Sequence, residues 1–146
     1  MPRGAVFLGS FGLAVLIGCS GPRTAGIVGT WVVKASGAPF PYHMFVFNAD
    51  GTMQQANPDA GDARTSDSDG KGVWVSEQGR IRGKFVELTA DRTTHQFVAR
   101  GEISYELRLS GDAFDGSATA RFYDIDGQLI QGPIATPLVG QRVTLP

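Results

Sequence analysis

Glu87 is the side chain whose surroundings in the sequence suggest chemistry. Apolar or small residues alternate with basic ones along this stretch: Ile81, Gly83, Phe85 and Glu87 share one face, and Arg80, Arg82 and Lys84 the other. In a regular strand the Glu87 carboxylate lies on the apolar inner face, where burial raises the pKa of a carboxyl group and suits it to orient a ligand or to act as an acid or base. A bulge after Lys84 would instead place Val86 and Leu88 inside and Glu87 in water. We expect the bulge, so Glu87 is a candidate only and no catalytic residue is assigned.

The other chemical motifs fail on spacing. His43 and His95 are the two histidines and Cys19 is the single cysteine, so a zinc site would need both histidines and carboxylates brought together by folding. The segment Asp67-Ser68-Asp69-Gly70 resembles part of a calcium loop, but that register puts Ser76 where a bidentate Glu is required. The sequence therefore indicates no metal and no cofactor.

The charges argue against a nucleic-acid partner. Fourteen acidic and 13 basic residues give a net charge of −1, and the two signs are interspersed along the chain, whereas nucleic-acid binding calls for a basic surface. After Cys19 no internal disulfide is possible, so the remaining chain of about 128 residues is held by its core alone, which is sufficient at that size.

The residues from 27 onward predict strands and turns and no helix, because β-branched and aromatic residues are grouped between Gly, Asp and Asn. The expected strands are 29–36, 42–48, 52–57, 72–77, 80–89, 95–109, 113–124, 127–131 and 138–145, with turns that include Asp50-Gly51 and one near Gly132-Pro133. Residues 58–70 are expected to form the longest loop. Short links between so many strands favour an all-β domain, an antiparallel up-and-down β-barrel of about eight strands over residues 27–146, with a two-sheet sandwich as the alternative.

Alternation is clearest from Phe97 to Leu109, where apolar residues on one face predict a buried side and charged residues on the other a wet side. This strand is long, so Gly101 is expected to mark a bulge. The aromatic residues predicted to line the lumen and contact a ligand are Phe45, Phe85, Phe97, Tyr105 and Phe122.

Two motifs at opposite ends of the domain resemble the calycin barrels, lipocalins and fatty-acid-binding proteins. The first is Gly29-Thr30-Trp31, which matches the Gly-x-Trp that opens their first strand. The second is Gly140-Gln141-Arg142-Val143. The resemblance implies that Trp31 closes the barrel floor and that Arg142 packs over its ring. Uncharacterised bacterial lipocalin-like proteins are similar in three motifs, here Gly29-Thr30-Trp31, Asp50-Gly51-Thr52 and Gly70-Lys71-Gly72-Val73-Trp74.

The first 18 residues have the layout of a secretory signal. Arg3 precedes an uncharged run from Gly4 to Gly18 that is too short to span a bilayer. Leu16-Ile17-Gly18-Cys19 resembles the lipobox of bacterial lipoproteins, which implies cleavage before Cys19 and a lipid on its thiol. Residues 19–26 then form a lipid-bearing, flexible tether. The expected location is the cell membrane or outer membrane, with the domain outside the cytoplasm; Ser20, in place of Asp, favours the outer membrane.

Three functions are compatible with such a chain. The leading one is a membrane-anchored envelope barrel that binds a small apolar or amphipathic ligand. The second is a barrel enzyme of the cyclase or isomerase type, which requires a polar group in the lumen. The third is an envelope protein-interaction or inhibitor module, which a filled core with a projecting loop 58–70 would favour.

Overall fold

The computed structural model describes residues 26–58 and 62–146, where every helix-or-strand element is a strand. The strands are β1 (Gly29–Ala35), β2 (Tyr42–Phe47), β3 (Thr52–Ala56), β4 (Thr65–Asp67), β5 (Gly70–Glu77), β6 (Arg80–Asp91), β7 (Phe97–Ser110), β8 (Ala113–Tyr123) and β9 (Leu129–Arg142). The all-β prediction is confirmed. The predicted signal segment 1–18, Cys19 and all of the tether but Gly26 lie outside the described residues.

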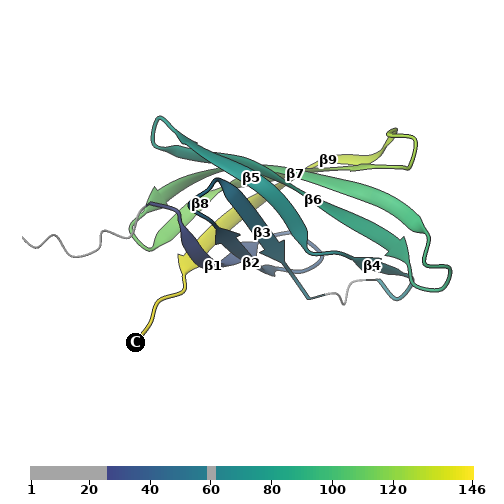
Figure 1. Ribbon diagram of the computed structural model, residues 1–146, viewed down its shortest axis with the longest axis horizontal. Coiled ribbons are helices and arrows are strands. Elements are labelled where there is room, and N and C mark those ends of the chain that lie inside the picture. Colours follow the sequence, from purple (N-terminus) through teal and green to yellow (C-terminus); the bar gives the residue numbers. More distant parts are fainter. Residues whose placement is uncertain (1–25, 59–61) are drawn as a thin grey trace, which may run out of the picture.

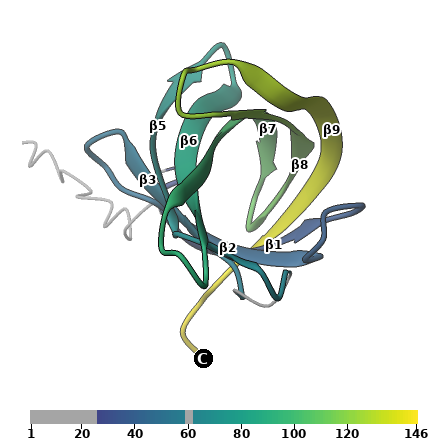
Figure 2. The ribbon, with the colours of Figure 1, turned by 90° about the vertical axis from the view of Figure 1, so that its right-hand side faces the viewer.

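Eight of these strands close into an antiparallel barrel (Figures 1 and 2). Starting from β1, the ring runs β2, β3, β5, β6, β7, β8 and β9, and β9 pairs back with β1. Each wall strand thus lies beside its neighbours in sequence, and closure satisfies the backbone groups that an open sheet edge would expose. The predicted up-and-down barrel is confirmed, and the sandwich is excluded.

The short strand β4 corrects the expectation that residues 58–70 form one loop. β4 pairs with the far end of β6, with Asp67 opposite Thr89. At the next position the Ser68 N–H donates to the Leu88 carbonyl at 2.9 Å, and the Leu88 N–H donates to Ser68 Oγ at 3.0 Å. β4 and β5 are therefore consecutive pieces of one wall. The prediction failed because β6 extends to Asp91, beyond its expected end, and offers more backbone to pair with.

A second correction concerns the last strand. We expected two short strands separated by a turn near Gly132-Pro133, but β9 is continuous. Its register against β8 shifts there, since Ala120 pairs with Ile134 whereas Phe122 pairs with Gln131. Gly132, with a φ of 104°, supplies the unusual backbone angle, and Pro133 falls where the ladder needs no donor. The Gly-Pro signal thus marks a bulge within a strand.

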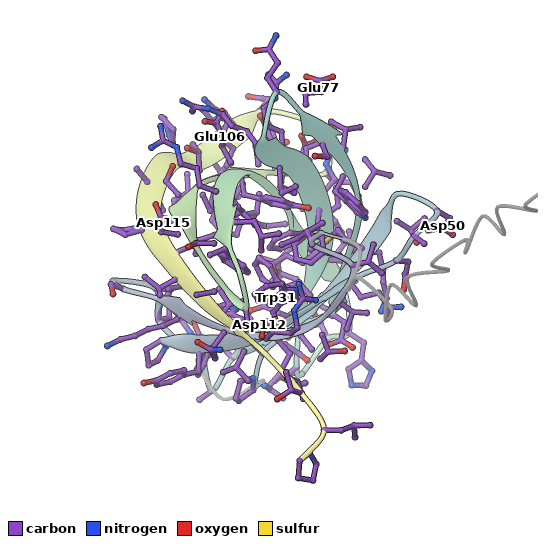
Figure 3. All side chains as sticks on the ribbon, turned by 90° about the vertical axis from the view of Figure 1, so that its left-hand side faces the viewer. Trp31, Asp50, Glu77, Glu106, Asp112 and Asp115 are labelled. Carbon is purple, nitrogen blue, oxygen red and sulfur yellow. The ribbon has the colours of Figure 1, made fainter. Side chains whose placement is uncertain are left out.

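Trp31 closes one end of the barrel, which we call the floor (Figure 3). Its indole is fully buried, and the ring centroid lies 5.0 Å from that of Phe114 on β8. The indole N–H donates to the Ile27 carbonyl at 2.8 Å, so the polar end of this large side chain is satisfied inside the core.

Arg142 packs over Trp31 from the end of β9. The guanidinium carbon lies 4.3 Å from the centroid of the indole ring, a stacking distance for a cation and an aromatic face. The guanidinium also donates to the carbonyls of Gly26 at 2.6 Å and Val28 at 2.7 Å and to Asp112 Oδ1 at 2.8 Å. Arg142 thereby ties the start of the described chain to its last strand, and the two residues singled out by the calycin resemblance meet at the floor.

The largest fully buried side chains gather on the floor side of the barrel. They are Trp31, Phe47, Phe114, Ile27, Met53 and Leu107. At the opposite end, which we call the mouth, the long β6–β7 and β8–β9 hairpins project (Figure 1), and the β1–β2 loop, residues 36–41, begins where Ala35 ends β1. The barrel is packed solid at the floor, so any interior space lies toward the mouth.

Candidate functional site

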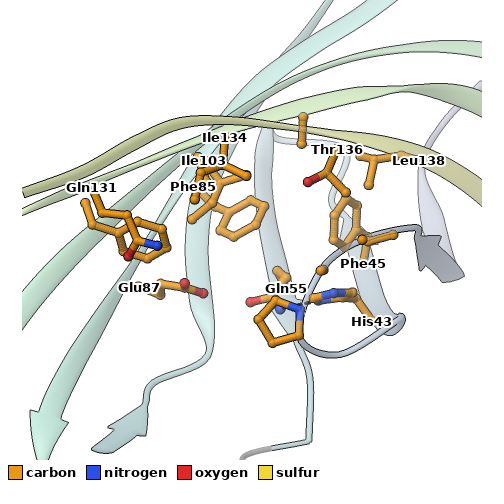
Figure 4. A pocket seen from close by; sticks show the side chains of 17 residues that line it. His43, Phe45, Gln55, Phe85, Glu87, Ile103, Gln131, Ile134, Thr136 and Leu138 are labelled. Carbon is orange, nitrogen blue, oxygen red and sulfur yellow. Dashed lines mark hydrogen bonds between the residues drawn. The ribbon is translucent and has the colours of Figure 1, made fainter. Parts of the chain in front are cut away.

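A cavity of about 380 Å³ opens at the mouth of the barrel (Figure 4). This volume lies within the range of ~300–1,000 Å³ usual for small-molecule sites. Its apolar lining consists of Ala35, Ala38, Pro39, Phe45, Phe85, Ile103, Ala118, Ala120, Phe122, Ile134 and Leu138. The polar side chains that join them are His43, Gln55, Glu87, Gln131 and Thr136. The site is thus an apolar pocket with a few polar groups.

Three of the five aromatic residues expected to contact a ligand line this cavity, namely Phe45, Phe85 and Phe122. Tyr105 does not, because it lies deeper, 4% exposed, with its ring centroid 6.0 Å from that of Phe45. Phe97 does not either and is 39% exposed. The β6–β7 register shifts at its end, where Ala90 pairs with Phe97 but Thr89 with Ala99, so the alternation that would have turned Phe97 inward is broken.

The expected bulge after Lys84 is absent, and Glu87 points into the cavity (Figure 4). β6 pairs with β7 without interruption from Ile81 to Thr89, so Glu87 shares the inner face with Phe85. Leu88, which the bulge would have buried, is 51% exposed. The shift in register occurs four residues later than expected, beyond Glu87.

Gly101, on β7 directly opposite Glu87, makes the space that this side chain occupies. A Cβ atom at residue 101 would lie 2.9 Å from Glu87 Cγ and 3.0 Å from Phe122 Cε1, closer than packed carbon atoms approach each other. The register runs regularly through Gly101 to both neighbouring strands, so the bulge predicted there is wrong. The glycine is needed for room inside the barrel rather than for a bend.

The Glu87 carboxylate has an environment that favours its neutral form. Burial, and secondarily the negative charge of Asp67, raise the pKa of Glu87 to about 7. No hydrogen bond or ion pair within the described residues involves this carboxylate. A carboxyl group that titrates near neutrality and faces an apolar cavity can accept a hydrogen bond or pair with a cation when ionised, and can donate when protonated.

Gln55 is a buried polar residue of the site that the sequence analysis did not identify. It is 1% exposed, and its Oε1 accepts a hydrogen bond from the Gly70 N–H at 3.1 Å. Because a backbone N–H can only donate, this contact fixes the amide orientation, and Nε2 then donates to Asn57 Oδ1 at 2.6 Å and to His43 Nδ1 at 3.0 Å. The inward face that Gln55 shares with Met53 on β3 was the signal available in the sequence.

His43 completes this network in a defined neutral tautomer. Since Nδ1 accepts from Gln55, the proton is on Nε2, which donates to the Phe40 carbonyl at 2.9 Å. Burial lowers the pKa of His43 and outweighs the opposing effect of the hydrogen bond to Phe40. Both ring nitrogens are engaged, so His43 positions the β1–β2 loop over the cavity rather than serving as a free base.

The described residues include no group of three or more His, Cys, Asp or Glu side chains placed to hold a metal ion. Asp67, from the calcium-like segment, instead accepts a hydrogen bond from Thr89 Oγ1 at 2.6 Å. No helix long and apolar enough to cross a membrane occurs in residues 26–58 and 62–146.

The comparisons with known proteins yield no relative. No protein-family model, no curated protein and no solved structure matches this chain. The argument for function therefore rests on the cavity and its polar groups.

Proposed function

We propose that this protein is a membrane-anchored lipoprotein of the bacterial cell envelope that binds one small apolar or amphipathic molecule inside its barrel. The observation that supports binding is the cavity of about 380 Å³ at the mouth, lined by Phe45, Phe85 and Phe122. The barrel is not filled by its own side chains, which favours a binding protein over an interaction module with a solid core. The anchor is proposed from the lipobox-like segment that ends at Cys19.

Binding is tested with a chain that begins at Ser20. It contains all eight wall strands, whose pairings close the barrel between residues 29 and 142, and cooperative thermal unfolding verifies its fold. Native mass spectrometry of this chain from a bacterial host, followed by solvent extraction, reports any co-purified molecule, and calorimetry with n-octanol measures binding directly. Absence of both would refute the binding proposal.

A pair of variants shows whether the ligand is in the cavity. Ala120→Leu adds a bulky side chain to the cavity wall, whereas Thr119→Leu adds the same side chain at the neighbouring position on the other face of β8. We expect the first to weaken n-octanol binding at least tenfold and the second to leave it unchanged. Equal effects of the two variants would place the ligand elsewhere.

The anchor has its own test in a bacterial host that processes lipoproteins. Metabolic labelling with an alkyne fatty acid is expected to mark the full chain and not its Cys19→Ser variant. Label on both chains, or on neither, would refute the anchor without affecting the binding proposal.

A second function, an enzyme that moves a proton, is favoured by one observation. The polar group that such an enzyme requires in its lumen is present, because Glu87 faces the cavity and its pKa is raised to about 7 by burial. Turnover of a co-purified molecule by the wild type, and its loss in Glu87→Gln, would support this reading. A molecule recovered unchanged after incubation would favour binding alone.

A further inference from the structure

The charge pattern of the cavity identifies a class of ligand. The lining contains a single acidic side chain, Glu87, and no lysine or arginine. An anionic ligand would therefore lose its hydration without gaining a countercharge. A cationic ligand would find a carboxylate that has no partner within the described residues.

The basic residues close to Glu87 in the ladder are engaged on the outside of the barrel. Glu102, next to Gly101 on β7, receives Lys84 Nζ at 2.9 Å on one carboxylate oxygen and Arg100 Nη2 at 3.0 Å on the other. The guanidinium of Arg100 also lies 5.3 Å from the ring centroid of Tyr123 on β8. These cations are held on the outer face and do not neutralise Glu87.

The other charged group that acts on Glu87 is Asp67 of β4, which carries the same sign. Two carboxylates near each other create a negative potential at the mouth, which opposes ionisation of Glu87 and attracts a cation. Phe122 of β8 and Gln131 of β9, opposite Glu87 in the ladder, carry no charge.

The remaining buried polar groups have no N–H to offer a ligand. His43 Nε2 donates to the Phe40 carbonyl, and both N–H groups of the Gln55 amide are used by His43 and Asn57. A carboxylate or phosphate head group would thus find no free donor at this end of the cavity, which again favours a positively charged ligand over a fatty acid.

The ladder also sets the direction in which such a ligand lies. Glu87 belongs to the level formed with Gly101, Phe122 and Gln131, two residues nearer the mouth than the level of Phe85, Ile103, Ala120 and Ile134. At ~3.3 Å per residue, these levels are about 7 Å apart along the strands. The acidic group is at the entrance and the apolar wall is below it.

We infer that the cavity is selective for a cationic amphiphile, a short apolar molecule with one protonated amine that pairs with Glu87 at the mouth while the apolar part fills the lumen. This inference rests on the proposed binding function and adds the class of ligand to it. The ammonium group stays near solvent, which limits the cost of its desolvation.

The test compares n-octylamine, n-octanol and n-octanoate by calorimetry on the chain from Ser20 at pH 8. We expect octylamine to bind at least tenfold more tightly than octanol, and octanoate most weakly. Octylamine stays protonated between pH 6 and 8, as a lysine side chain does, so its affinity follows the ionisation of Glu87 and falls about tenfold at pH 6. Octanol binding is expected to be independent of pH.

Two Glu→Gln variants on neighbouring strands separate the site from the general charge of the protein. Glu87→Gln is expected to bring octylamine and octanol to within about twofold of each other and to abolish the pH dependence of octylamine binding. Glu102→Gln removes the same charge from the outer face and is expected to leave the tenfold preference intact.

The outcomes distinguish the two proposals. Octanol binding without a preference for octylamine, a preference for octanoate, or an amine preference that survives Glu87→Gln would overturn the inferred ligand class and leave cavity binding in place. Failure of all three compounds to bind would overturn both.

Discussion

The guanidinium carbon of Arg142 lies 4.3 Å from the centre of the Trp31 indole, and the same guanidinium donates to the carbonyls of Gly26 and Val28. The side chain of Arg142 is only 7% exposed. The stack and the hydrogen bonds form one unit that joins the first strand, the last strand and the residues that precede the barrel.

Replacement of this arginine is expected to be costly. Arg142→Ala leaves two carbonyls without a donor and exposes the face of Trp31, so we expect the free energy of unfolding to fall by about 2–4 kcal/mol in urea titrations. Arg142→Lys keeps the charge without the planar fork and is expected to recover less than half of the loss. Arg108→Ala, an exposed arginine on β7, serves as the control, with an expected change within ~0.5 kcal/mol. Equal effects at Arg108 and Arg142 would contradict this account.

Glu87 makes stability depend on pH in a direction unusual for a carboxylate. Its folded-state pKa of about 7 exceeds that of an unfolded chain, so between about pH 4.5 and 7 the native state binds more protons and stability falls as pH rises. Glu87→Gln mimics the protonated form. We expect this variant to match the wild type near pH 4 and to be more stable by about 1–3 kcal/mol above pH 7.5, as measured by urea titrations across pH. A constant difference at all pH values would argue against this assignment.

His43 is expected to show the opposite dependence. Burial lowers its pKa below 6.5, so the neutral native form contributes stability above that pH and loses it as the pH falls below 6.5. Nitrogen-15 NMR is expected to report a neutral ring with the proton on Nε2 at pH 6.5. Gln55→Leu removes the donor to Nδ1 and is expected to lower stability by about 1–3 kcal/mol. An Nδ1–H tautomer in the wild type would disprove the hydrogen-bond network.

The hydroxyl of Tyr105 is buried and has no hydrogen-bond partner among the described residues. Gly83 provides its space, since a Cβ atom there would lie 2.2 Å from the oxygen. Tyr105→Phe removes an unsatisfied polar group and keeps the ring, so we expect the free energy of unfolding to be unchanged or to rise by up to ~1 kcal/mol. A loss greater than about 1 kcal/mol, measured by urea titration, would show that the hydroxyl is satisfied in solution.

The barrel was predictable because its causes are local. Strict alternation across β7, glycine-containing turns such as Asp50-Gly51, and the motifs at Trp31 and Arg142 each report a neighbour or a periodicity that the chain itself displays. A closed ring follows once about eight such strands have short links between them.

The cavity was harder to predict because its residues depend on exact register. Whether Glu87 faces inward is decided by where the β6–β7 ladder shifts, and a displacement of one residue reverses the face. The shift is at Thr89 and Ala90 rather than after Lys84, and the same shift turns Phe97 outward. Gly101 provides a sequence signal only when its partner across the ladder is known, and Gln55 only when Gly70 is known to lie opposite it.

The contact of Arg142 with Gly26 also fixes where the chain enters the barrel, which is the floor and not the mouth. Under the proposed anchor at Cys19, the seven residues from Ser20 to Gly26 reach at most about 25 Å when fully extended. The floor is then the end nearest the bilayer, and the cavity opens to the aqueous compartment. A ligand on this route arrives as a dissolved solute, so its supply depends on its concentration in that compartment and not on direct exchange with the lipid chains beneath the protein.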